Sequence, residues 1–596
     1  MEDRPIILPP QPSDAEVVRL LERYPLPLEN GLPHAFDYGT AGFRYPAIML
    51  ESLLVRVGIF AAYRSSQLNQ SIGVMVTASH NDESYNGVKL ADPHGGMMSP
   101  DGEALAVTLA NAQTVQQVLQ LVSTRVSVNG TGGGGVIHVG RDTRSHSPAL
   151  TQLLIRAAQA MGATVLLHGV VTTPILHYCV MMSNPRYLPP IIPPRPNVQG
   201  YYDQIANAYV GLLRGTQSDG PGSAAPFETP LVVDCACGVG YAHVQRLNQT
   251  LQCLGARRLL LAENSPDEGP LNEGCGSEHV QKHVMPPQWY ADDGPDTNTA
   301  ITYAASLDGD ADRIVFFSQV PKFTLLDGDK IAVLLCDFLQ SQVSSVQSTM
   351  QRMSDSPVAT KKQKSLASPL KLGVVQTAYA NGASTTYLKH ILGEEHVLIA
   401  KTGVKHAHEA AHHNFDIGVY FEANGHGTVL FGDAYYDFLA HADEHIRGHV
   451  ALQRLQLLPA LINQAVGDAL CDLLLVDAIL QIKGWNIQDW NRLYTDLPSR
   501  QCKVSVEDRT IILTNANETE CTSPVELQHE LNAAMARYPT QSRCFVRPSG
   551  TENVVRVYAE AQTQQQADEL ATLAAKIVHS ICRGVGEPPV FPSSKM

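Results

Sequence analysis

The chain has 596 residues, of which 44% are hydrophobic and 17% are charged. At roughly 150 residues per domain this length predicts about four domains, and the composition is typical of a globular protein with large cores. The formal net charge of −15 argues against general nucleic-acid binding, which requires a basic surface, but it allows a local basic pocket for an anionic small molecule.

Cysteine usage and the absence of a long apolar run both bear on cellular location. The eleven cysteines are scattered without a framework, which predicts reduced thiols and a cytoplasmic protein. The N-terminal segment has no secretory signal pattern. The apolar run at 469–482 is interrupted by Asp472 and Asp477, so we expect no membrane helix. The terminal Ser-Lys-Met resembles a peroxisomal address, which raises import into a peroxisome or glycosome-type organelle as a second expectation.

Several segments have the pattern strand, loop, helix, strand. One strand is expected from Val136, a helix from near Pro148 to Met161, and a second strand over Thr164–Leu167 after a stop at Gly162. Residues 230–251 and 370–393 repeat the strand–turn–helix part. The sequence therefore predicts three related α/β domains with mixed, largely parallel sheets, whose ligands would bind at the carboxyl ends of the strands.

The C-terminal part differs, because 543–561 read as two strands around a loop and 563–582 as an amphipathic helix. This predicts a smaller α+β domain. The expected domains are 1–195, 196–320, 321–475 and 476–596, with a disordered surface insertion at about 340–370, where Ser, Gln and Lys dominate.

The first candidate site is the loop around Ser79. Small polar residues from Thr77 to Asn81, with His80 among them, directly follow a buried strand. The plain interpretation is a polar turn, and the functional one is a nucleophile or a phosphorylation site. A G-x-S-x-G nucleophile elbow is excluded because no glycine flanks Ser79.

The second candidate site is "DGDADR", in which Asp308, Asp310 and Asp312 alternate. Three carboxylates from one tight loop can converge on a hard cation such as Mg²⁺ or Ca²⁺. An EF-hand is excluded because Arg313 stands where glycine is required. A solvated acidic turn is the alternative, although unpaired carboxylates this close would repel one another. The later "LDGDK" has two acids only and is expected to be a turn.

The third candidate site is "FEANGHG", which presents Glu422, Asn424 and His426 along a loop after an expected strand. Paired donors and acceptors of this kind suit a polyhydroxylated ligand. A capped turn is the alternative.

The fourth candidate site is "RPSGTENVVRVY", in which Arg547, Ser549, Gly550 and Thr551 are followed by Arg556. Guanidinium groups, hydroxyls and close backbone N–H groups bind a phosphate dianion well. A surface hairpin with scattered arginines is the alternative.

Together the four loops offer a serine, a divalent-metal site, a sugar site and a phosphate clamp. Phosphoryl transfer on a phosphosugar needs these parts, since a metal neutralises the moving group and fixed donors hold the other phosphate. A residue must also carry the phosphoryl group between turnovers.

The motifs "TASHN", "DGDADR", "FEANGHG" and "RPSGTE" in this order resemble the α-D-phosphohexomutase superfamily. Within it, the chain is similar to the family of eukaryotic phosphoacetylglucosamine mutases, on "YGTAGFR", "VGRDTR", "LNEGCGSEHV", "QTAYANGAST" and "KTGVKHAH". The matches run from about residue 38 to 561 and cover nearly the whole chain. Relatives that act on glucose or mannose phosphates usually carry a "GEMSGH"-type sugar loop, so "EANGHG" is the most family-specific motif.

The resemblance implies an active site in a central cleft between four domains. The implied site residues are Ser79 as phosphoserine and metal ligand; Asp308, Asp310 and Asp312 as the other ligands of one Mg²⁺ per chain; Lys89, Arg44 and His80 as catalytic groups; Arg313, Glu422, Asn424 and His426 at the sugar; and Arg547, Ser549, Gly550, Thr551 and Arg556 at the phosphate that is not transferred.

The implied activity is that of an isomerase, which interconverts N-acetylglucosamine 6-phosphate and N-acetylglucosamine 1-phosphate through a 1,6-bisphosphate. A hexose 1,6-bisphosphate would be the activator, and the 1-phosphate would serve UDP-N-acetylglucosamine biosynthesis. The expected partner is the small phosphosugar alone, without nucleic acid or membrane, and the expected state is a monomer or weak homodimer.

The chain departs from the superfamily pattern at three positions. Asp82 replaces a proline, Tyr85 replaces an acid, and Asn553 stands where Asp is common. Loss of the proline makes the serine loop less rigid, and Asp82 adds a negative charge near the serine. Two alternatives stay open: the same chemistry on glucose or mannose phosphate, and a catalytically silent regulatory relative. A metal-dependent phosphatase is disfavoured because no water-activating base is evident.

Overall fold

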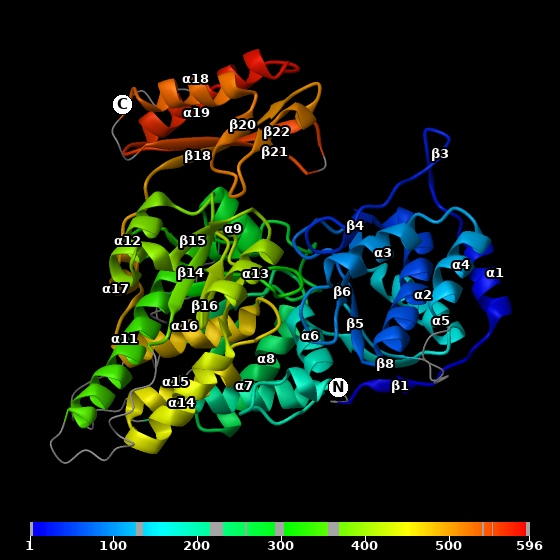
Figure 1. The fold of residues 1–596 in the computed structure, drawn as a ribbon, viewed down its shortest axis with the longest axis horizontal. Coiled ribbons are helices and arrows are strands. Elements are labelled where there is room, and N and C mark those ends of the chain that lie inside the picture. Colours follow the sequence, from blue (N-terminus) through cyan, green and yellow to red (C-terminus); the bar gives the residue numbers. More distant parts are fainter. Residues whose placement is uncertain are drawn as a thin grey trace.

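The computed structural model describes residues 4–126, 135–214, 230–256, 259–292, 303–355, 369–538, 542–550 and 552–591. Figure 1 shows the first domain on the right, the second and third domains on the left, and the C-terminal domain above them. Within the described ranges, no helix combines the length and apolar character needed to cross a membrane.

The first domain is built on a six-stranded sheet with the order β1-β8-β7-β5-β6-β4. Helices α2 and α5 pack against each other beside this sheet. Its elements are β1 (Ile6–Leu8), α1 (Asp14–Arg23), β2 (Leu28–Glu29), β3 (Leu32–Pro33), β4 (Phe43–Pro46), the 3₁₀ helix η1 (Ala47–Met49), α2 (Glu51–Leu68), β5 (Ile72–Val76), β6 (Tyr85–Ala91), α3 (Pro100–Ala110), α4 (Val115–Val126), β7 (Val136–Arg141), α5 (Ser147–Ala160), β8 (Thr164–Val170), α6 (Thr173–Met182) and η2 (Pro185–Tyr187).

The second domain has a five-stranded sheet with the order β10-β9-β11-β12-β13. Its elements are α7 (Val198–Leu212), β9 (Leu231–Asp234), α8 (Gly240–Cys253), β10 (Leu260–Glu263), α9 (Ser277–His283), α10 (Gln288–Asp292), β11 (Ala304–Leu307), β12 (Ile314–Ser318) and β13 (Thr324–Leu326).

The third domain has a four-stranded sheet with the order β15-β14-β16-β17. Its elements are α11 (Gly328–Ser354), β14 (Leu372–Thr377), α12 (Gly382–Leu392), η3 (Glu394–His396), β15 (Val397–Ala400), α13 (Val404–Asn414), β16 (Ile417–Phe421), β17 (Gly427–Phe431), α14 (Asp433–Ile446), α15 (Val450–Leu461), α16 (Ala469–Lys483) and α17 (Ile487–Asn491).

The three larger sheets share one spatial arrangement, in which two parallel pairs are followed by an antiparallel hairpin. The hairpins are β5–β6, β11–β12 and β16–β17, and each adjoins a central parallel strand. This confirms related α/β domains with mixed sheets. Antiparallel pairing at the edges, including β1, β4 and β13, makes the sheets less parallel than the sequence predicted.

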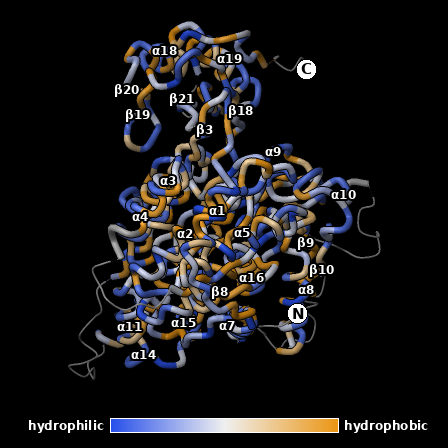
Figure 2. The backbone as a smooth tube through the Cα atoms, turned by 90° about the vertical axis from the view of Figure 1, so that its right-hand side faces the viewer, coloured by the Kyte–Doolittle hydropathy of each residue, from blue (hydrophilic) through white to orange (hydrophobic). Residues whose placement is uncertain are grey.

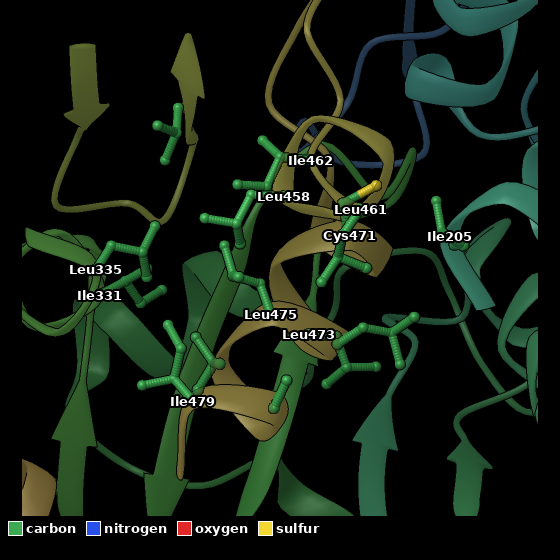
Figure 3. Close-up of a cluster of buried hydrophobic side chains, with 14 of the residues drawn as sticks. Ile205, Ile331, Leu335, Leu458, Leu461, Ile462, Cys471, Leu473, Leu475 and Ile479 are labelled. Carbon is green, nitrogen blue, oxygen red and sulfur yellow. The ribbon is translucent and has the colours of Figure 1, made fainter. Parts of the chain in front are cut away.

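Helix α16 lies at the centre of a core that the second and third domains share. All residues from Ala469 to Leu480 are buried, and Figure 3 shows Leu473, Leu475 and Ile479 among side chains from neighbouring helices. Asp477 accepts hydrogen bonds from the hydroxyls of two tyrosines, Tyr209 at 2.6 Å and Tyr303 at 2.9 Å. Burial of this carboxylate is tolerated because it is hydrogen-bonded.

The C-terminal domain is a three-stranded antiparallel sheet, β18-β22-β21, with α18 and α19 packed on one face. Figure 2 shows it standing apart above the body of the molecule. Its elements are β18 (Ser499–Ser505), η4 (Arg509–Ile511), β19 (Leu513–Thr514), β20 (Cys521–Ser523), α18 (Val525–Met535), β21 (Arg543–Pro548), β22 (Val554–Glu560) and α19 (Gln564–Ile581).

The face of this sheet opposite the helices contacts the third domain. The ring of Tyr379, in the loop after β14, packs on Phe545 at 5.1 Å between centroids and on Tyr558 at 5.9 Å. The backbone N–H of Gly382 donates to the Glu560 carboxylate at 3.0 and 3.1 Å. The loop after β14 therefore forms the main surface on which the C-terminal domain packs.

The structure corrects four predictions about the third domain and its boundaries. Residues 340–354 are helical rather than disordered, because Val343, Val346 and Met350 bury one face of α11; residues 356–368 of the expected insertion lie outside the described ranges. The boundary expected after residue 475 falls inside α16, and the boundary after 320 precedes β13, which belongs to the second sheet. In "LDGDK", Asp327 is the N-cap of α11, accepting from the backbone of Asp329 and Lys330.

Candidate active site

Each of the four predicted site loops is the turn of an antiparallel hairpin. The serine loop joins β5 to β6, the aspartate loop joins β11 to β12, the "EANGH" loop joins β16 to β17, and the "SGTEN" loop joins β21 to β22. The shared sheet arrangement puts the first three at equivalent places in their domains. This equivalence explains why one fold unit can supply three different parts of a site.

The serine and aspartate loops meet at a single hydrogen bond. Ser79 is fully buried, has φ of +54°, and its hydroxyl donates to Asp308 Oδ2 at 2.6 Å. Its backbone N–H donates to Thr77 Oγ1 at 3.1 Å. A non-glycine residue in the left-handed region is uncommon and is often found at functional sites. The structure thus holds Ser79 in a strained backbone conformation, with its hydroxyl against the expected metal loop.

Two residues without a predicted role hold the serine loop through its carbonyl oxygens. The side-chain amide of Asn272 donates to the carbonyls of Ser79 at 3.0 Å and Asn81 at 3.2 Å. The buried guanidinium of Arg144 donates to the same two carbonyls and pairs with Asp142. The motifs "VGRDTR" and "LNEGCGSEHV" contain these residues, but local sequence gives no sign of partners 65 and 193 positions away.

The three aspartates converge as predicted. One ligand atom from each of Asp308, Asp310 and Asp312 lies within 4.8 Å of the others, and all three side chains are buried. Asp308 Oδ1 accepts from the backbone of Asp312 at 3.0 Å. Gly309 is required here, because a Cβ at that position would lie 2.7 Å from the carbonyl oxygen of Ser79.

These residues fit a hard divalent cation. Asp310 Oδ1 and Asp312 Oδ1 are buried acceptors without a hydrogen-bond donor among the described residues, and carboxylate oxygens are the ligands that Mg²⁺ prefers. Burial and the Asp312 and Asp310 carboxylates raise the pKa of Asp308 well above its usual range. A bound cation would remove this repulsion.

Lys89 is placed against the aspartates rather than against the serine. Its Nζ donates to Asp310 Oδ2 at 2.7 Å and to Asp312 Oδ2 at 2.6 Å. Burial lowers the pKa of Lys89, but the two carboxylates outweigh this and raise it. Thr173, at the start of α6, also donates to Asp310 Oδ2, at 2.6 Å. The lysine therefore stays charged and neutralises part of the acidic loop.

His80, Arg44 and Arg313 surround the meeting point of these two loops. His80 Nδ1 lies 3.3 Å from Ser79 Oγ, and its Nε2 lies 3.4 Å from Glu278 Oε2. Burial and the nearby Arg313 and Arg44 lower the pKa of His80 well below its usual value, so its imidazole is neutral at pH 7. Burial and Arg313 also lower the pKa of Arg44.

Glu278, on α9, is a further residue that sequence reasoning missed. Besides facing His80, its carboxylate lies 3.4 Å from Arg313 Nη1, while Arg313 Nε lies 3.8 Å from Asp312 Oδ1. The single acid therefore holds Arg313 beside the metal loop. The sequence "SEHV" around Glu278 resembles the start of a helix, and nothing in its spacing identifies Arg313 as a partner.

The sugar loop rests directly on the aspartate loop. His426 is buried and its Nδ1 lies 2.7 Å from the carbonyl oxygen of Asp312, and Ile314 donates its backbone N–H to Gly425 at 3.2 Å. Gly425 has φ of +85° and a Cβ there would lie 1.9 Å from the carbonyl oxygen of Ile314. Glu422 and Asn424 are half-buried and hydrogen-bonded to each other at 3.4 Å, with capacity left for a ligand.

The phosphate loop ends a row of three cations. Arg547 on β21, Arg556 on β22 and Lys503 on β18 are cross-strand neighbours, on the face opposite the buried valines that contact the helices. Lys503 was not predicted. Of the loop residues, the carbonyl of Gly550 accepts from Arg509 at 2.6 Å and Ser549 Oγ accepts from the backbone of Glu552 at 3.4 Å, whereas Thr551 lies outside the described ranges.

Three loops are thus brought into contact and the fourth is not. Among the described residues, no hydrogen bond or ion pair joins the phosphate loop to the other three. A pocket of about 510 Å³ lies beside the metal loop, with Lys89, Asp312 and His426 on its polar side. Its other walls are contributed by Tyr38, Thr40, Ala41, Leu90, Met97, Glu103, Thr173, His177, Val404, Tyr420 and Val466.

Two of the three departures from the superfamily pattern, Asp82 and Asn553, have local explanations. The exposed Asp82 accepts from the backbone N–H of Ser84 at 3.1 Å, an Asx turn that fixes the loop where proline is missing. Asn553 donates its amide to the carbonyl of Glu507 at 3.1 Å, a bond that an ionised Asp could not make. Tyr85 is half-buried at the start of β6.

Family models match three separate parts of the chain. Family models match residues 327–485 (Phosphoacetylglucosamine mutase AMG1, domain III), residues 513–577 (Phosphoglucomutase/phosphomannomutase, C-terminal domain) and residues 59–114 and 102–185 (Phosphoglucomutase/phosphomannomutase, alpha/beta/alpha domain I). The third-domain match ends after α16, in agreement with the corrected boundary.

Individual relatives align almost end to end. Phosphoacetylglucosamine mutase of Arabidopsis thaliana is 40% identical over 585 residues, covering 95% of this chain and 98% of the relative. A crystal structure of Aspergillus fumigatus N-acetylphosphoglucosamine mutase with GlcNAc-6P and magnesium superposes with a TM-score of 0.80 at 38% identity, covering 96% and 100% of the two chains. A serine-to-alanine form of that enzyme with glucose 1,6-bisphosphate superposes at 0.79 and 37% identity, covering 95% and 98%.

Proposed function

This chain belongs to the phosphoacetylglucosamine mutases of the α-D-phosphohexomutase superfamily, and from this premise we propose the roles of its residues. The activity is an isomerisation between N-acetylglucosamine 6-phosphate and N-acetylglucosamine 1-phosphate. The cofactor is Mg²⁺ and the activator is a hexose 1,6-bisphosphate. The 1-phosphate is the form required for UDP-N-acetylglucosamine.

Ser79 is the residue that carries the phosphoryl group. The supporting observation is that its buried hydroxyl donates to Asp308 Oδ2 at 2.6 Å. The proposed nucleophile therefore lies in direct contact with a proposed metal ligand. The phosphoserine gives its phosphoryl group to O1 of the 6-phosphate: the O1–P bond forms as the Ser79 Oγ–P bond breaks, O1 loses its proton, and the leaving Oγ takes one up. After the bisphosphate turns over, Ser79 Oγ attacks phosphorus at the 6-position, and O6 leaves and takes up a proton.

Asp308, Asp310 and Asp312 are the residues that would hold Mg²⁺, together with an oxygen on Ser79. Bound there, the cation would neutralise charge on the transferring phosphoryl group. Lys89 holds two of the three carboxylates in place through contacts of 2.6 and 2.7 Å. Ser79 and the carboxylates are shielded from water by burial, which protects a phosphoenzyme from hydrolysis.

His80 and Arg44 act beside the serine. The neutral imidazole of His80, 3.3 Å from Ser79 Oγ, can accept the proton that Oγ releases and return it to the leaving sugar oxygen. The Arg44 cation, within electrostatic reach of all three aspartates, stabilises the negative charge that develops during transfer. Lys89 acts electrostatically, since its ammonium group contacts the carboxylates of Asp310 and Asp312.

The sugar and the second phosphate are held by the remaining residues. Glu422, Asn424 and His426 present their polar groups to sugar hydroxyls, with Arg313 at the edge of the metal loop. Arg547, Ser549, Gly550, Thr551 and Arg556 hold the phosphate that is not transferred, by charge-assisted and backbone hydrogen bonds. The C-terminal domain meets the third domain through the loop after β14 and the Thr402–Glu518 contact, a small set of contacts that lets it move while the bisphosphate reorients.

Two alternatives are tested by one experiment, ³¹P NMR of the purified protein with Mg²⁺ and a catalytic amount of hexose 1,6-bisphosphate. N-acetylglucosamine 6-phosphate and glucose 6-phosphate are supplied in separate tubes. Faster conversion of the acetylated sugar, abolished by Ser79→Ala, is expected. Faster conversion of glucose 6-phosphate would assign a different hexose, and no product from folded, Ser79-phosphorylated protein would favour a silent relative.

Cellular location and assembly are proposed from weaker observations. All eleven cysteines are free, which supports a reducing compartment such as the cytoplasm. Import through the terminal Ser-Lys-Met is the second proposal, although residues 592–596 lie outside the described ranges. Deletion of this tripeptide in a tagged protein tests it by loss of punctate localisation. We propose a monomer or weak homodimer, tested by sedimentation.

A further inference from the structure

Glu518 lies in a tight loop between β19 and β20 and has an unusual backbone. It is 4% exposed and has φ of +58°. Asn515 fixes the loop, because its Oδ1 accepts from the backbone of Thr519 at 2.9 Å and of Glu520 at 3.2 Å. A left-handed glutamate costs roughly 1 kcal/mol or more, and such a conformation persists only where the surroundings impose it.

One oxygen of this buried carboxylate contacts two groups outside its own loop. Glu518 Oε2 accepts the backbone N–H of Thr402 at 3.0 Å and forms an ion pair with Arg547 Nε at 3.1 Å. Thr402 belongs to the third domain, in the loop between β15 and α13. The carboxylate thus connects the phosphate-binding arginine to a neighbouring domain.

The loop that carries Thr402 is itself tied to the first domain. Lys405, three residues further on, donates to Glu103 Oε2 at 2.9 Å. A chain of polar contacts therefore runs from the first domain through the third domain to the C-terminal domain. The described residues offer few other polar links between the C-terminal and third domains beyond the loop after β14.

We propose that Glu518 is a positioning residue that aims Arg547 at the phosphate and latches the C-terminal domain in the position that it has in this structure. The inference rests on the proposed function and adds a residue to it. The ion pair involves Nε of Arg547, and the terminal nitrogens of a guanidinium are the donors that suit bidentate binding of a phosphate dianion. Glu518 and Arg547 belong to the same domain and move together, but the oxygen that pairs with Arg547 is itself fixed by the Thr402 N–H. A movement that breaks the Thr402 contact therefore frees the carboxylate that positions Arg547, which couples the position of the C-terminal domain to phosphate binding.

Two variants separate the two contacts. Glu518→Gln retains an oxygen that can accept the Thr402 N–H but loses the charge that holds Arg547, whereas Glu518→Ala loses both. Glu520→Ala is the matched control, since Glu520 is exposed in the same loop. The readouts are hydrogen exchange of the peptide that contains Thr402, KM and kcat for N-acetylglucosamine 6-phosphate, and the amount of free bisphosphate released per turnover.

Faster exchange at Thr402 is expected in Glu518→Ala and not in Glu518→Gln. Both variants should raise KM about tenfold, as for loss of a charge-assisted contact, and Glu518→Ala should release severalfold more bisphosphate because the domain opens prematurely. A merely structural role would change stability without changing bisphosphate release.

Unchanged exchange, KM and bisphosphate release in Glu518→Ala would overturn the latch, as would equal effects of Glu520→Ala. If Glu518→Ala does not fold, KM of Glu518→Gln decides the kinetic question. An unaltered KM in Glu518→Gln would contradict the proposal that Glu518 positions Arg547. A wild-type protein that converts no phosphosugar would contradict the proposed function instead, and the exchange of Thr402 would still decide the latch.

Discussion

His426 Nδ1 lies 2.7 Å from the backbone carbonyl oxygen of Asp312, so the sugar loop and the metal loop form one unit. The ring is buried, and its Nδ1–H is the donor that this carbonyl requires. The contact fixes both the tautomer of the imidazole and the position of a metal ligand. The proposed sugar site and the proposed metal site are therefore linked through one side chain.

Replacement of His426 should impair catalysis through the metal loop. His426→Ala leaves the Asp312 carbonyl without its donor, and we expect a loss of about 10- to 100-fold in kcat/KM, or roughly 1–3 kcal/mol. The apparent Kd for Mg²⁺ should rise in parallel. His413→Ala, at an exposed position on α13, is the control and should have no effect. A defect in sugar affinity with unaltered Mg²⁺ dependence would contradict the link.

Asp308→Asn should inactivate the enzyme while stabilising its metal-free form. Burial and two neighbouring carboxylates raise the pKa of Asp308, so the folded chain keeps this proton after the unfolded chain, with a pKa near 3.9, has released it. The stability of metal-free wild type therefore falls as pH rises above about 4, whereas that of the variant does not.

Thermal unfolding in EDTA measures this difference. The Tm of Asp308→Asn should exceed that of wild type, and the gap should widen between about pH 5 and about pH 8. Added Mg²⁺ should reverse the order, since it stabilises only the wild type strongly. Asp267→Asn, an exposed aspartate, is the control. A wild type as stable as Asp308→Asn throughout would show that the three carboxylates do not repel.

Replacement of Asn272 should lower the catalytic rate, although the sequence assigned no role to this residue. Asn272→Asp places a negative charge against the carbonyls of Ser79 and Asn81, which it now holds at 3.0 and 3.2 Å. We expect kcat to fall about tenfold or more, with a smaller change in KM, because the serine loop shifts relative to the metal loop. Asn414→Asp, at an exposed helix end, is the control and should leave kcat and KM unchanged. If Asn272→Asp changed KM alone, Asn272 would contact the substrate rather than position the serine loop.

The row of cations on the C-terminal sheet should act on affinity. Arg556→Ala is expected to raise KM about 10- to 100-fold, the effect of one charge-assisted phosphate contact. Lys503→Ala should raise KM only a few-fold, because Lys503 is exposed and screened by solvent. Lys576→Ala, on the exposed side of α19, is the control. The effects on KM should weaken with added salt. An equal increase in KM for all three variants would indicate that the net charge of the domain attracts the substrate, rather than specific contacts to its phosphate.

Local signals in the sequence predicted the elements and the motif residues well. The helix after β7 begins and ends near the expected residues, because Pro148 suits its first turn and Gly162 follows its end. Alternating aspartates predicted a metal site because the loop itself brings them together. Helix α11 was missed because its Ser- and Gln-rich face suggested disorder, although Val343, Val346 and Met350 have helical spacing.

Residues that act through distant partners could not be predicted in this way. Arg144 and Asn272 bind backbone carbonyls, which every residue possesses, and Glu518 finds its partner Thr402 116 positions away. The equivalent hairpin position of the first three loops was also hidden, because the first domain reaches it with a different strand order. Such relationships follow from tertiary packing and leave no periodic trace.

The most direct test of the account is the fate of a phosphoryl group on Ser79. Protein treated with hexose 1,6-bisphosphate and Mg²⁺ is digested and its phosphopeptides are identified by mass spectrometry, before and after addition of N-acetylglucosamine 6-phosphate. We expect one phosphoryl group, on Ser79, that is lost upon addition of the sugar phosphate and recovered in a sugar bisphosphate. A phosphoryl group on another residue, or one on Ser79 that the sugar phosphate does not remove, would contradict it.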